Sequence, residues 1–352
     1  MNTSNFSSAR LIAASLFLAA VVTVPAQSVV TEPVGFTTLT VAAKPGSGRG
    51  FTYLSVNMVR PTEFRSIVPV GGAATVTGQT VLTFPANSFT ANQFFGTANA
   101  HFIELTNGTS AGVLADVVSN TTNTVTLAED ITSLIVGGSS TVRVRPHWTF
   151  GTLFGTANTA GFLAGTSGTA DLVSILNPAT GGFSNYYYSS ANSRWQIGLS
   201  TIANDVVIRP DAGLLIERKL TSAFSFTVVG EVKLGNTEVV IVGGSAAGNY
   251  TLAPNPYPLP SVTLAASGLY TGNTATGVLK GTSGTADIVS IFNSGTGGFS
   301  NYYYSAANNR WQTGLSTVAD TVVIPEGAAV LIFRRPGNGS FSWFVPQPAM
   351  NL

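Results

Sequence analysis

A stretch of 55 residues occurs twice in this chain, and this repeat limits the folds that the chain can adopt. Gly165–Lys219 aligns with Gly281–Arg335 at an offset of 116 residues without a gap, and 38 of the 55 positions are identical. Differences at expected core positions mostly keep an apolar side chain, as where Leu172 faces Ile288. Sequences this similar are expected to form the same supersecondary unit, so we predict two copies of one structure in tandem.

The apolar segments of the chain are short, and their composition is typical of β-strands. TVLTF, DLVSILNP and TEVVIVGG are rich in Val, Ile, Phe and Thr, and turn residues close them. Both faces of an extended Asp287–Phe292 are apolar, which favours a strand packed between two layers. We therefore predict an all-β fold of two tandem homologous β-sandwich-like repeats. The best helix candidate is a turn or two at Leu127–Ile135, with Glu129 and Asp130 near its dipole.

Similarity between the two halves extends beyond the identical stretch and suggests where each repeat begins and ends. The flanking matches are Phe224–Val228 with Phe341–Val345, Val34–Leu39 with Val229–Leu234, and Thr52–Pro61 with Tyr250–Pro258. The first half is longer by a segment that itself alternates strand and turn signals. We predict that residues 27–61 plus 147–228 form the first repeat and 229–352 the second. Residues 62–146 would be an inserted small β module, with its two ends close together on the host.

The first residues have the pattern of a secretion signal. Arg10 precedes the uncharged apolar run Leu11–Val24, which is too short to span a bilayer, and small residues precede Gln27. We predict that residues 1–26 are a cleaved signal peptide; an N-terminal anchor is the alternative. No later segment has the length and hydropathy of a membrane span. The expected location is the periplasm, the cell surface or the medium.

Charge and cysteine content exclude several classes of function. Without Arg10 the chain has 15 Lys and Arg residues and 15 Asp and Glu residues, and charged residues make up only 9% of the whole. Nucleic acids and anionic membranes need clustered positive charge, so neither is expected as a partner. The absence of cysteine excludes disulfides and thiolate metal sites. We predict no cofactor.

Residues capable of catalysis do not form a recognisable motif. His101 and His147 stand alone, so neither a zinc site nor a catalytic triad is indicated, and packing beside Phe102 or Trp148 is favoured. GTSGTAD lacks the lysine of a phosphate loop and leads into a strand rather than a helix, which indicates a tight turn.

In that turn the aspartates, Asp171 and Asp287, are expected to accept hydrogen bonds from turn amides. The enzymatic alternative pairs Asp171 with Asp211, or Asp287 with Glu326, as the two carboxylates of a glycoside hydrolase or lyase. We predict no catalytic and no metal-binding residue.

The phrase GGFSNYYYS, present in both copies, allows two interpretations. Strand alternation places Tyr186 with Tyr188 on one face and Tyr187 on the other. The favoured interpretation is an aromatic brace in which Tyr186 and Tyr302 are largely buried. The alternative is an exposed platform for a sugar or a partner protein. Its candidate residues are Tyr187, Trp195, Tyr303 and Trp311.

Three segments carry a family resemblance. VGFTTLT, RVRPHWTFGTLFG and VVIRPDAGLLIERK resemble an uncharacterised family of exported proteins from verrucomicrobial bacteria, over nearly the whole chain after the signal. The second copy is also similar to C-terminal β segments of large secreted bacterial surface proteins, and the predicted module resembles small β modules of exported and tail-type proteins. These resemblances imply export and supply no catalytic motif.

Together these patterns predict an exported, non-enzymatic structural or interaction protein of the bacterial cell surface or envelope. Its expected partners are surface polysaccharide or other envelope proteins. The alternative is a secreted carbohydrate-binding or carbohydrate-degrading protein.

Overall fold

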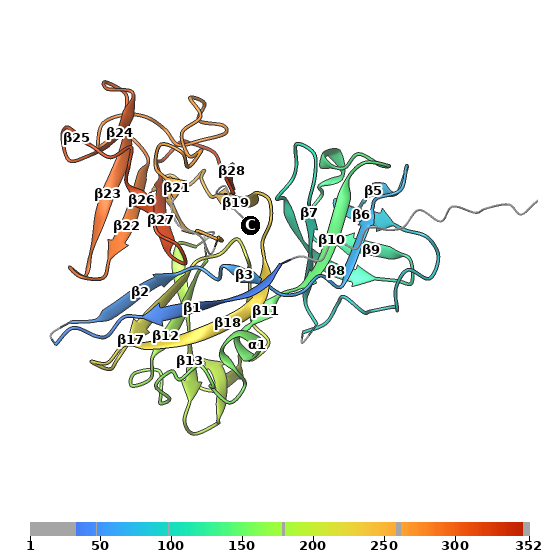
Figure 1. The fold of residues 1–352 in the computed structure, drawn as a ribbon, viewed down its shortest axis with the longest axis horizontal. Helices are drawn as coiled ribbons and strands as arrows, with labels where there is room; N and C mark the ends of the chain where they lie inside the picture. The colour runs from blue at the N-terminus through green and yellow to red at the C-terminus, as the bar shows by residue number, and fades with distance from the viewer. Residues whose placement is uncertain (1–32, 47, 98, 178–179, 258–261, 348–352) are drawn as a thin grey trace, which may run out of the picture. The chain divides into compact units, whose positions relative to one another are not determined.

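Figure 1 shows the computed structural model, which describes residues 33–46, 48–97, 99–177, 180–257 and 262–347. The predicted signal peptide, residues 1–26, lies outside the described residues. Strands dominate the described part, where the helices are α1 (Phe150–Phe154) and the 3-10 helix η1 (Thr132–Leu134). The all-β prediction is therefore confirmed. In the part of the chain that the structure describes, no helix has the length and apolar character needed to cross a bilayer.

The first copy of the repeated sequence lies in a six-stranded antiparallel sheet, which we call the first sheet. Its strands, in spatial order, are β15 (Thr201–Ile202), β14 (Arg194–Ile197), β13 (Gly182–Ser189), β12 (Leu172–Asn177), β17 (Leu214–Arg218) and β2 (Gly50–Leu54). The second copy lies in another six-stranded sheet, the second sheet. Its order is β25 (Thr317–Val318), β24 (Arg310–Thr313), β23 (Gly298–Ser305), β22 (Ile288–Asn293), β27 (Ala329–Arg334) and β20 (Asn249–Pro254).

The two sheets match strand for strand and in register. Val173 pairs with Tyr186 in the first sheet, and Val289 pairs with Tyr302 in the second. Within the two sheets, β2 and β20 hold the same place beside β17 and β27. The identical residues therefore make the same cross-strand contacts in both sheets.

A second layer of strands covers one face of each sheet. For the first sheet it is the ribbon β1 (Val34–Val41), β18 (Phe224–Val232) and β3 (Met58–Val59), and for the second the pair β19 (Thr237–Ile241) and β28 (Phe341–Val345). Two shorter pairs lie beside them, β11 (Trp148–Thr149) with β16 (Val207–Ile208) and β21 (Val262–Thr263) with β26 (Val323–Ile324). Leu39 and Phe226 pack with Trp195 in one core, and Val239 and Trp343 with Trp311 in the other. Burial of these layers against each other makes the sandwich-like arrangement.

One flanking sequence match is wrong. Val34–Leu39 was aligned with Val229–Leu234, but the two segments pair with each other, Phe36 opposite Val229; Figure 1 shows the blue β1 beside the yellow β18. The counterpart of β1 is β19, because Ala42 N donates to Thr52 Oγ1 at 2.9 Å as Val242 N donates to Thr251 Oγ1 at 3.0 Å. The predicted boundary after residue 228 thus falls inside β18. Short alternating strands of similar composition do not specify which partner they pair with.

The strands between Phe64 and Pro146 form a sheet of their own with its own apolar core. In spatial order they are β4 (Phe64–Ile67), β10 (Thr141–Pro146), β7 (His101–Leu105), β8 (Leu114–Asn120), β9 (Thr124–Leu127), β6 (Gln79–Thr83) and β5 (Ala73–Val76). The two ends of this segment lie together, since Trp148 Nε1 donates to Met58 O at 2.8 Å and Arg60 Nη1 donates to His147 O at 3.4 Å. Ends that lie this close allow a module to be inserted without disturbing its host.

The helix predicted at Leu127–Ile135 is mostly absent. Strand β9 extends to Leu127, and only η1 is helical, with no acidic residue in its first turn. Helix α1 was not predicted from the sequence. It begins where Thr149 Oγ1 accepts a hydrogen bond from Thr152 N, and Thr152 Oγ1 in turn accepts one from Thr149 N. This capping box stabilises a helix of only five residues, which is too short for hydrophobic periodicity to reveal it in the sequence.

Candidate functional site

The four aromatic residues predicted as a possible ligand surface do not form one. Their relative exposures are 4% for Tyr187, 0% for Trp195, 5% for Tyr303 and 2% for Trp311. Both tryptophans belong to the sandwich cores. The prediction of an exposed platform at these residues is therefore corrected, because rings this deeply buried present no aromatic face on which a sugar or a partner protein could stack.

The tyrosines are buried in the reverse of the expected order. Tyr186 and Tyr302, expected to be largely buried, are half-buried against the cores. Tyr187 lies deeper because its hydroxyl donates to Gly198 O at 2.8 Å and accepts a hydrogen bond from Gln196 Nε2 at 2.6 Å. Tyr303 donates to Gly314 O at 3.0 Å in the same way. The outer face of each hairpin is thus covered by the turn that follows it.

Those turns present the most exposed large apolar side chains among the described residues. Leu199 is 91% exposed and Leu315 is 93% exposed, each in the turn GLST that joins β14 to β15 or β24 to β25. Ile202 and Val318 are about half exposed on the adjoining edge strands. Sequence reasoning missed this feature, although a leucine kept in both copies of a turn was a signal that could have revealed it.

The aspartates of GTSGTAD are buried in ion pairs. Asp171 pairs with Arg218, and Asp287 pairs with Arg334. Asp171 Oδ1 accepts from Lys219 N at 2.8 Å, and Oδ2 accepts from Leu163 N at 2.8 Å. Asp287 makes the equivalent pair of hydrogen bonds with the amides of Arg335 and Leu279. The aspartates accept hydrogen bonds from amides as predicted, but the donors lie outside the turn: one just before it and the other on a distant strand end.

The alternative carboxylate pairs are not supported by these contacts. Asp211 binds Arg209, with 3.0 Å from its Oδ1 to the arginine Nε. Glu326 is exposed, and among the described residues no hydrogen bond joins it to Asp287. All buried carboxylates in the described part of the chain are ion-paired, and they are Glu104, Asp171, Glu217, Glu231 and Asp287. Groups tied up in this way hold the fold together rather than being available to transfer protons.

Both histidines are buried beside aromatic rings. The ring centroids of His147 and Phe102 are 4.7 Å apart, and those of His101 and Phe94 are 5.2 Å apart. His101 Nε2 lies 3.1 Å from Glu63 Oε2. Of the two predicted aromatic neighbours, Phe102 packs beside His147, whereas His101 packs beside Phe94. Within the described residues, no group of three or more His, Asp or Glu side chains could hold a metal ion.

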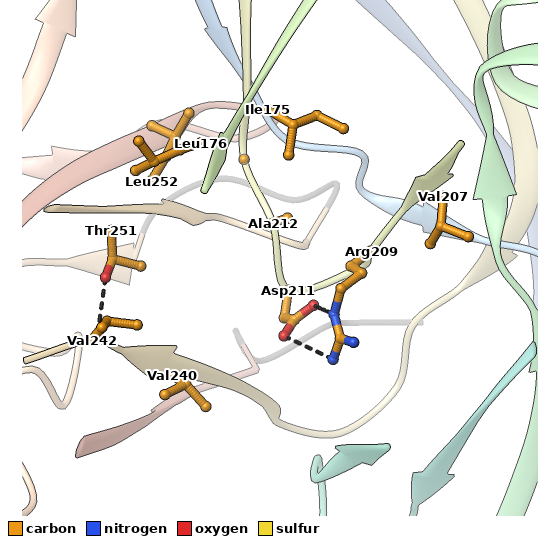
Figure 2. Close-up of a pocket in the computed structure, with 11 residues that line it drawn as sticks. Ile175, Leu176, Val207, Arg209, Asp211, Ala212, Val240, Val242, Thr251 and Leu252 are labelled. Atoms are coloured by element: carbon orange, nitrogen blue, oxygen red, sulfur yellow. Dashed lines mark hydrogen bonds and ion pairs between the residues drawn. The ribbon is translucent and has the colours of Figure 1, made fainter. Parts of the chain in front are cut away.

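An apolar pocket of about 230 Å³ lies where the first sheet approaches β19 and β20. Figure 2 shows Arg209 and Asp211 at its border and Ile175, Leu176 and Leu252 along its wall. Arg209 also pairs with Asp116, whose Oδ1 lies 3.1 Å from His147 Nε2. The charged groups at the border of the pocket therefore neutralise one another across the contact between the segment after β16 and the seven-stranded sheet.

Two carboxyl groups near this pocket have shifted pKa values in opposite directions. Burial would raise the pKa of Asp116, but the His147 hydrogen bond and the Arg209 charge outweigh it and lower the pKa. Burial and the nearby Asp116 charge raise the pKa of Glu129. Opposite shifts occur in acid–base pairs. In this pair, however, both carboxylate oxygens of Asp116 already bind His147 or Arg209, and Glu129 Oε2 accepts a hydrogen bond from Asp116 N at 3.2 Å. The contacts of both carboxyl groups are therefore structural.

A second charged cluster is buried between the seven-stranded sheet and the end of β18. Glu104 pairs with Lys233 and with Arg145, and Arg145 also pairs with Glu231. Burial would raise the pKa of Glu104, but the charges of Lys233 and Arg145 lower it overall. The four residues fix the junction between module and host, since removing one partner of a buried pair leaves an uncompensated charge.

No protein-family model, no curated protein and no solved structure matches this chain. The geometry of the described residues therefore carries the functional conclusion.

Proposed function

We propose that this is an exported, non-enzymatic structural or interaction protein of the bacterial cell surface or envelope. The observation that carries the proposal is the pair of almost fully exposed leucines, Leu199 and Leu315, in identical turns of the two sheets. The signal-like residues 1–26 and the resemblance to exported verrucomicrobial proteins support the location.

Each leucine is held in a defined position. The Tyr187 hydroxyl binds the carbonyl of Gly198, the residue before Leu199, and Tyr303 does the same at Gly314, before Leu315. A rigid apolar tip loses little conformational entropy when a partner covers it. Burial of one exposed leucine contributes about 1.5–3 kcal/mol. A partner that buries both leucines would therefore gain a substantial part of its binding free energy from them.

Neighbouring edge strands strengthen the proposal. β15 and β25 are the terminal strands of the first and second sheets, and each carries a half-exposed apolar residue, Ile202 or Val318. Edge strands have backbone groups available to pair with a further strand. A partner that docks there would cover the leucine tip and extend the sheet in one step.

The experiment uses residues 27–352, isolated envelope fragments of the producing bacterium and a cosedimentation assay. The double variant Leu199→Ser/Leu315→Ser should bind at least tenfold more weakly at an unchanged melting temperature. Val70→Ser is the matched control, because Val70 is also apolar and 86% exposed but belongs to the seven-stranded module. Equal binding by the double variant and the wild type would contradict the proposal. Finding Met1 at the N-terminus of protein recovered from the producing organism would contradict export through a cleaved signal.

A further inference from the structure

A pocket lies beside the second sheet. It measures about 320 Å³, and its walls include Tyr270, Tyr304 and Trp311 together with Arg310 and Asp320. A site of this size, with an aromatic wall and a few polar groups, is typical of small-ligand recognition. We propose that this pocket binds one sugar ring of a neutral polysaccharide. The inference goes beyond the proposed function, since it concerns another place on the molecule than the leucine tips.

Two tyrosines form the aromatic wall. The rings of Tyr270 and Tyr304 are stacked with centroids 3.4 Å apart and planes 14° from parallel, and both side chains are half-buried. The Tyr304 hydroxyl donates to Asn309 O at 2.7 Å, which fixes its ring. The C–H groups on one face of a pyranose are weakly positive and pack against the negative face of such a ring.

Polar groups in this pocket lack partners that their counterparts in the first sheet possess. Three of the four indole N–H groups donate to backbone carbonyls, namely those of Trp148, Trp195 and Trp343. Among the described residues, nothing accepts from the indole N–H of Trp311. Buried tryptophan N–H groups usually find an acceptor, so this donor is available to a ligand.

Arg310 and Asp320 add a donor and an acceptor. Within the described part of the chain, the guanidinium of Arg310 has no hydrogen-bonding or carboxylate partner, and its Nε is buried. The Nε of Arg194 is also without a partner, but its Nη2 donates to Ser200 O at 2.8 Å. Asp320 Oδ1 accepts from Trp311 N at 2.9 Å, which leaves Oδ2 available. Adjacent sugar hydroxyls each need both a donor and an acceptor, and these two side chains supply them.

At the equivalent place in the first sheet, aromatic side chains cover the tryptophan. Phe150 N donates to Val206 O, and Leu264 N donates to the equivalent Val322 O, so Leu264 occupies the place of Phe150. The ring of Phe150 lies 5.3 Å from that of Trp195, and α1 brings Phe154 to the same distance. The segment after β21 forms no helix in its described residues, so this aromatic cover is missing above Trp311.

The charges of the pocket favour an uncharged ligand. An anionic sugar would place its carboxylate or sulfate near Asp320, and a cationic ligand would meet the guanidinium of Arg310. A neutral sugar ring avoids both repulsions and can still hydrogen-bond to both groups. The ligand class is therefore a neutral hexose, pentose or N-acetylhexosamine polymer.

The test is calorimetric titration of residues 27–352 with hexasaccharides of glucose, mannose, xylose and N-acetylglucosamine, and with an oligogalacturonate as the acidic probe. We expect one neutral hexasaccharide to bind at one site per chain, with a Kd below about 1 mM. Arg310→Gln and Tyr270→Ala should each weaken binding at least tenfold, whereas the matched variant Arg194→Gln should leave it unchanged. Melting temperatures identify any variant that is misfolded.

Three results would overturn the inference. They are the absence of binding to every neutral probe, binding of the acidic probe alone, and equal losses from Arg194→Gln and Arg310→Gln. The double variant Leu199→Ser/Leu315→Ser should bind the saccharide normally, so failure of this inference is distinguishable from failure of the proposed function.

Discussion

Trp195 and Trp311 occupy the same position in two sheets of matching register, yet their surroundings differ. Each forms an edge-to-face contact with the preceding tyrosine, at 5.7 Å with Tyr188 and 5.8 Å with Tyr304. The indole N–H of Trp195 is bound to Gly155 O, and that of Trp311 has no acceptor among the described residues. The difference lies in the segment before the repeated stretch, where the first copy has α1 and the second does not. A duplicated hairpin can therefore remain a structural brace in one sheet and border a pocket in the other.

The largest expected effect tests what the two copies share. Asp171→Ala and Asp287→Ala each leave an arginine buried without its carboxylate, which should destabilise the protein by about 3–5 kcal/mol. Urea unfolding of the two variants measures the free energies. Because the pairs and their amide contacts are equivalent, we expect similar losses. A small effect for only one variant would show that the two frameworks are not equivalent.

The second-largest expected effect concerns a contact between the two copies of the repeat. A Cβ added to Gly213 would lie 2.5 Å from the Cβ of Ala329, the residue that holds the equivalent place in the second copy. Gly213→Ala should therefore cost about 1–3 kcal/mol through overpacking. Adding Ala329→Gly should restore only part of the loss, because the added Cβ would also lie 2.7 Å from Leu252 Cγ and 3.0 Å from Leu252 O. A double-mutant cycle measures the part restored.

Gly182→Ala is the control for that cycle. A Cβ at Gly182 would have no neighbour nearer than 3.5 Å, so little change is expected. If Gly213→Ala were equally harmless, the packing of the two copies described above would be incorrect.

A smaller effect distinguishes the two buried tyrosines. Tyr187→Phe removes a hydrogen bond to Gly198 O and another from Gln196, whereas Tyr303→Phe removes only the bond to Gly314 O. At about 1 kcal/mol for each bond, the expected losses are about 2 and about 1 kcal/mol. Thermal unfolding of both variants measures the difference. The reverse order would contradict the additional hydrogen bond from Gln196 to Tyr187.

The strands of the repeated hairpins were predictable from the sequence. The pairing of the flanking strands and the burial within the hairpin were not. Alternation correctly separates Tyr187 from Tyr186 and Tyr188, but it does not show that the next turn folds back over Tyr187. The ion pair of Asp171 was also missed, since Arg218 is distant in the sequence and belongs to another strand. An arginine present at the same offset in both copies was the available signal.

The candidate pocket could not have been found from the repeat alone. Its lining includes Tyr270, and Leu264 stands where the first copy has Phe150; both residues lie upstream of the identical stretch. Because the sequences around Trp195 and Trp311 are so similar, the repeat predicts the same surroundings for both tryptophans. Both indoles are buried, but only Trp195 is covered by the aromatic rings of α1, a helix of five residues.

The most direct test of this account is the hydrogen exchange of the four tryptophan indole N–H groups, followed by NMR of ¹⁵N-labelled residues 27–352. Trp195→Phe and Trp311→Phe variants assign the two signals in question. The Trp195 N–H, bonded to Gly155 O at 3.0 Å, should exchange slowly, as should those of Trp148 and Trp343. The Trp311 N–H should exchange fastest of the four, because no acceptor among the described residues holds it. Equal protection of Trp195 and Trp311 would contradict the claim that the Trp195 N–H has an acceptor and the Trp311 N–H has none among the described residues.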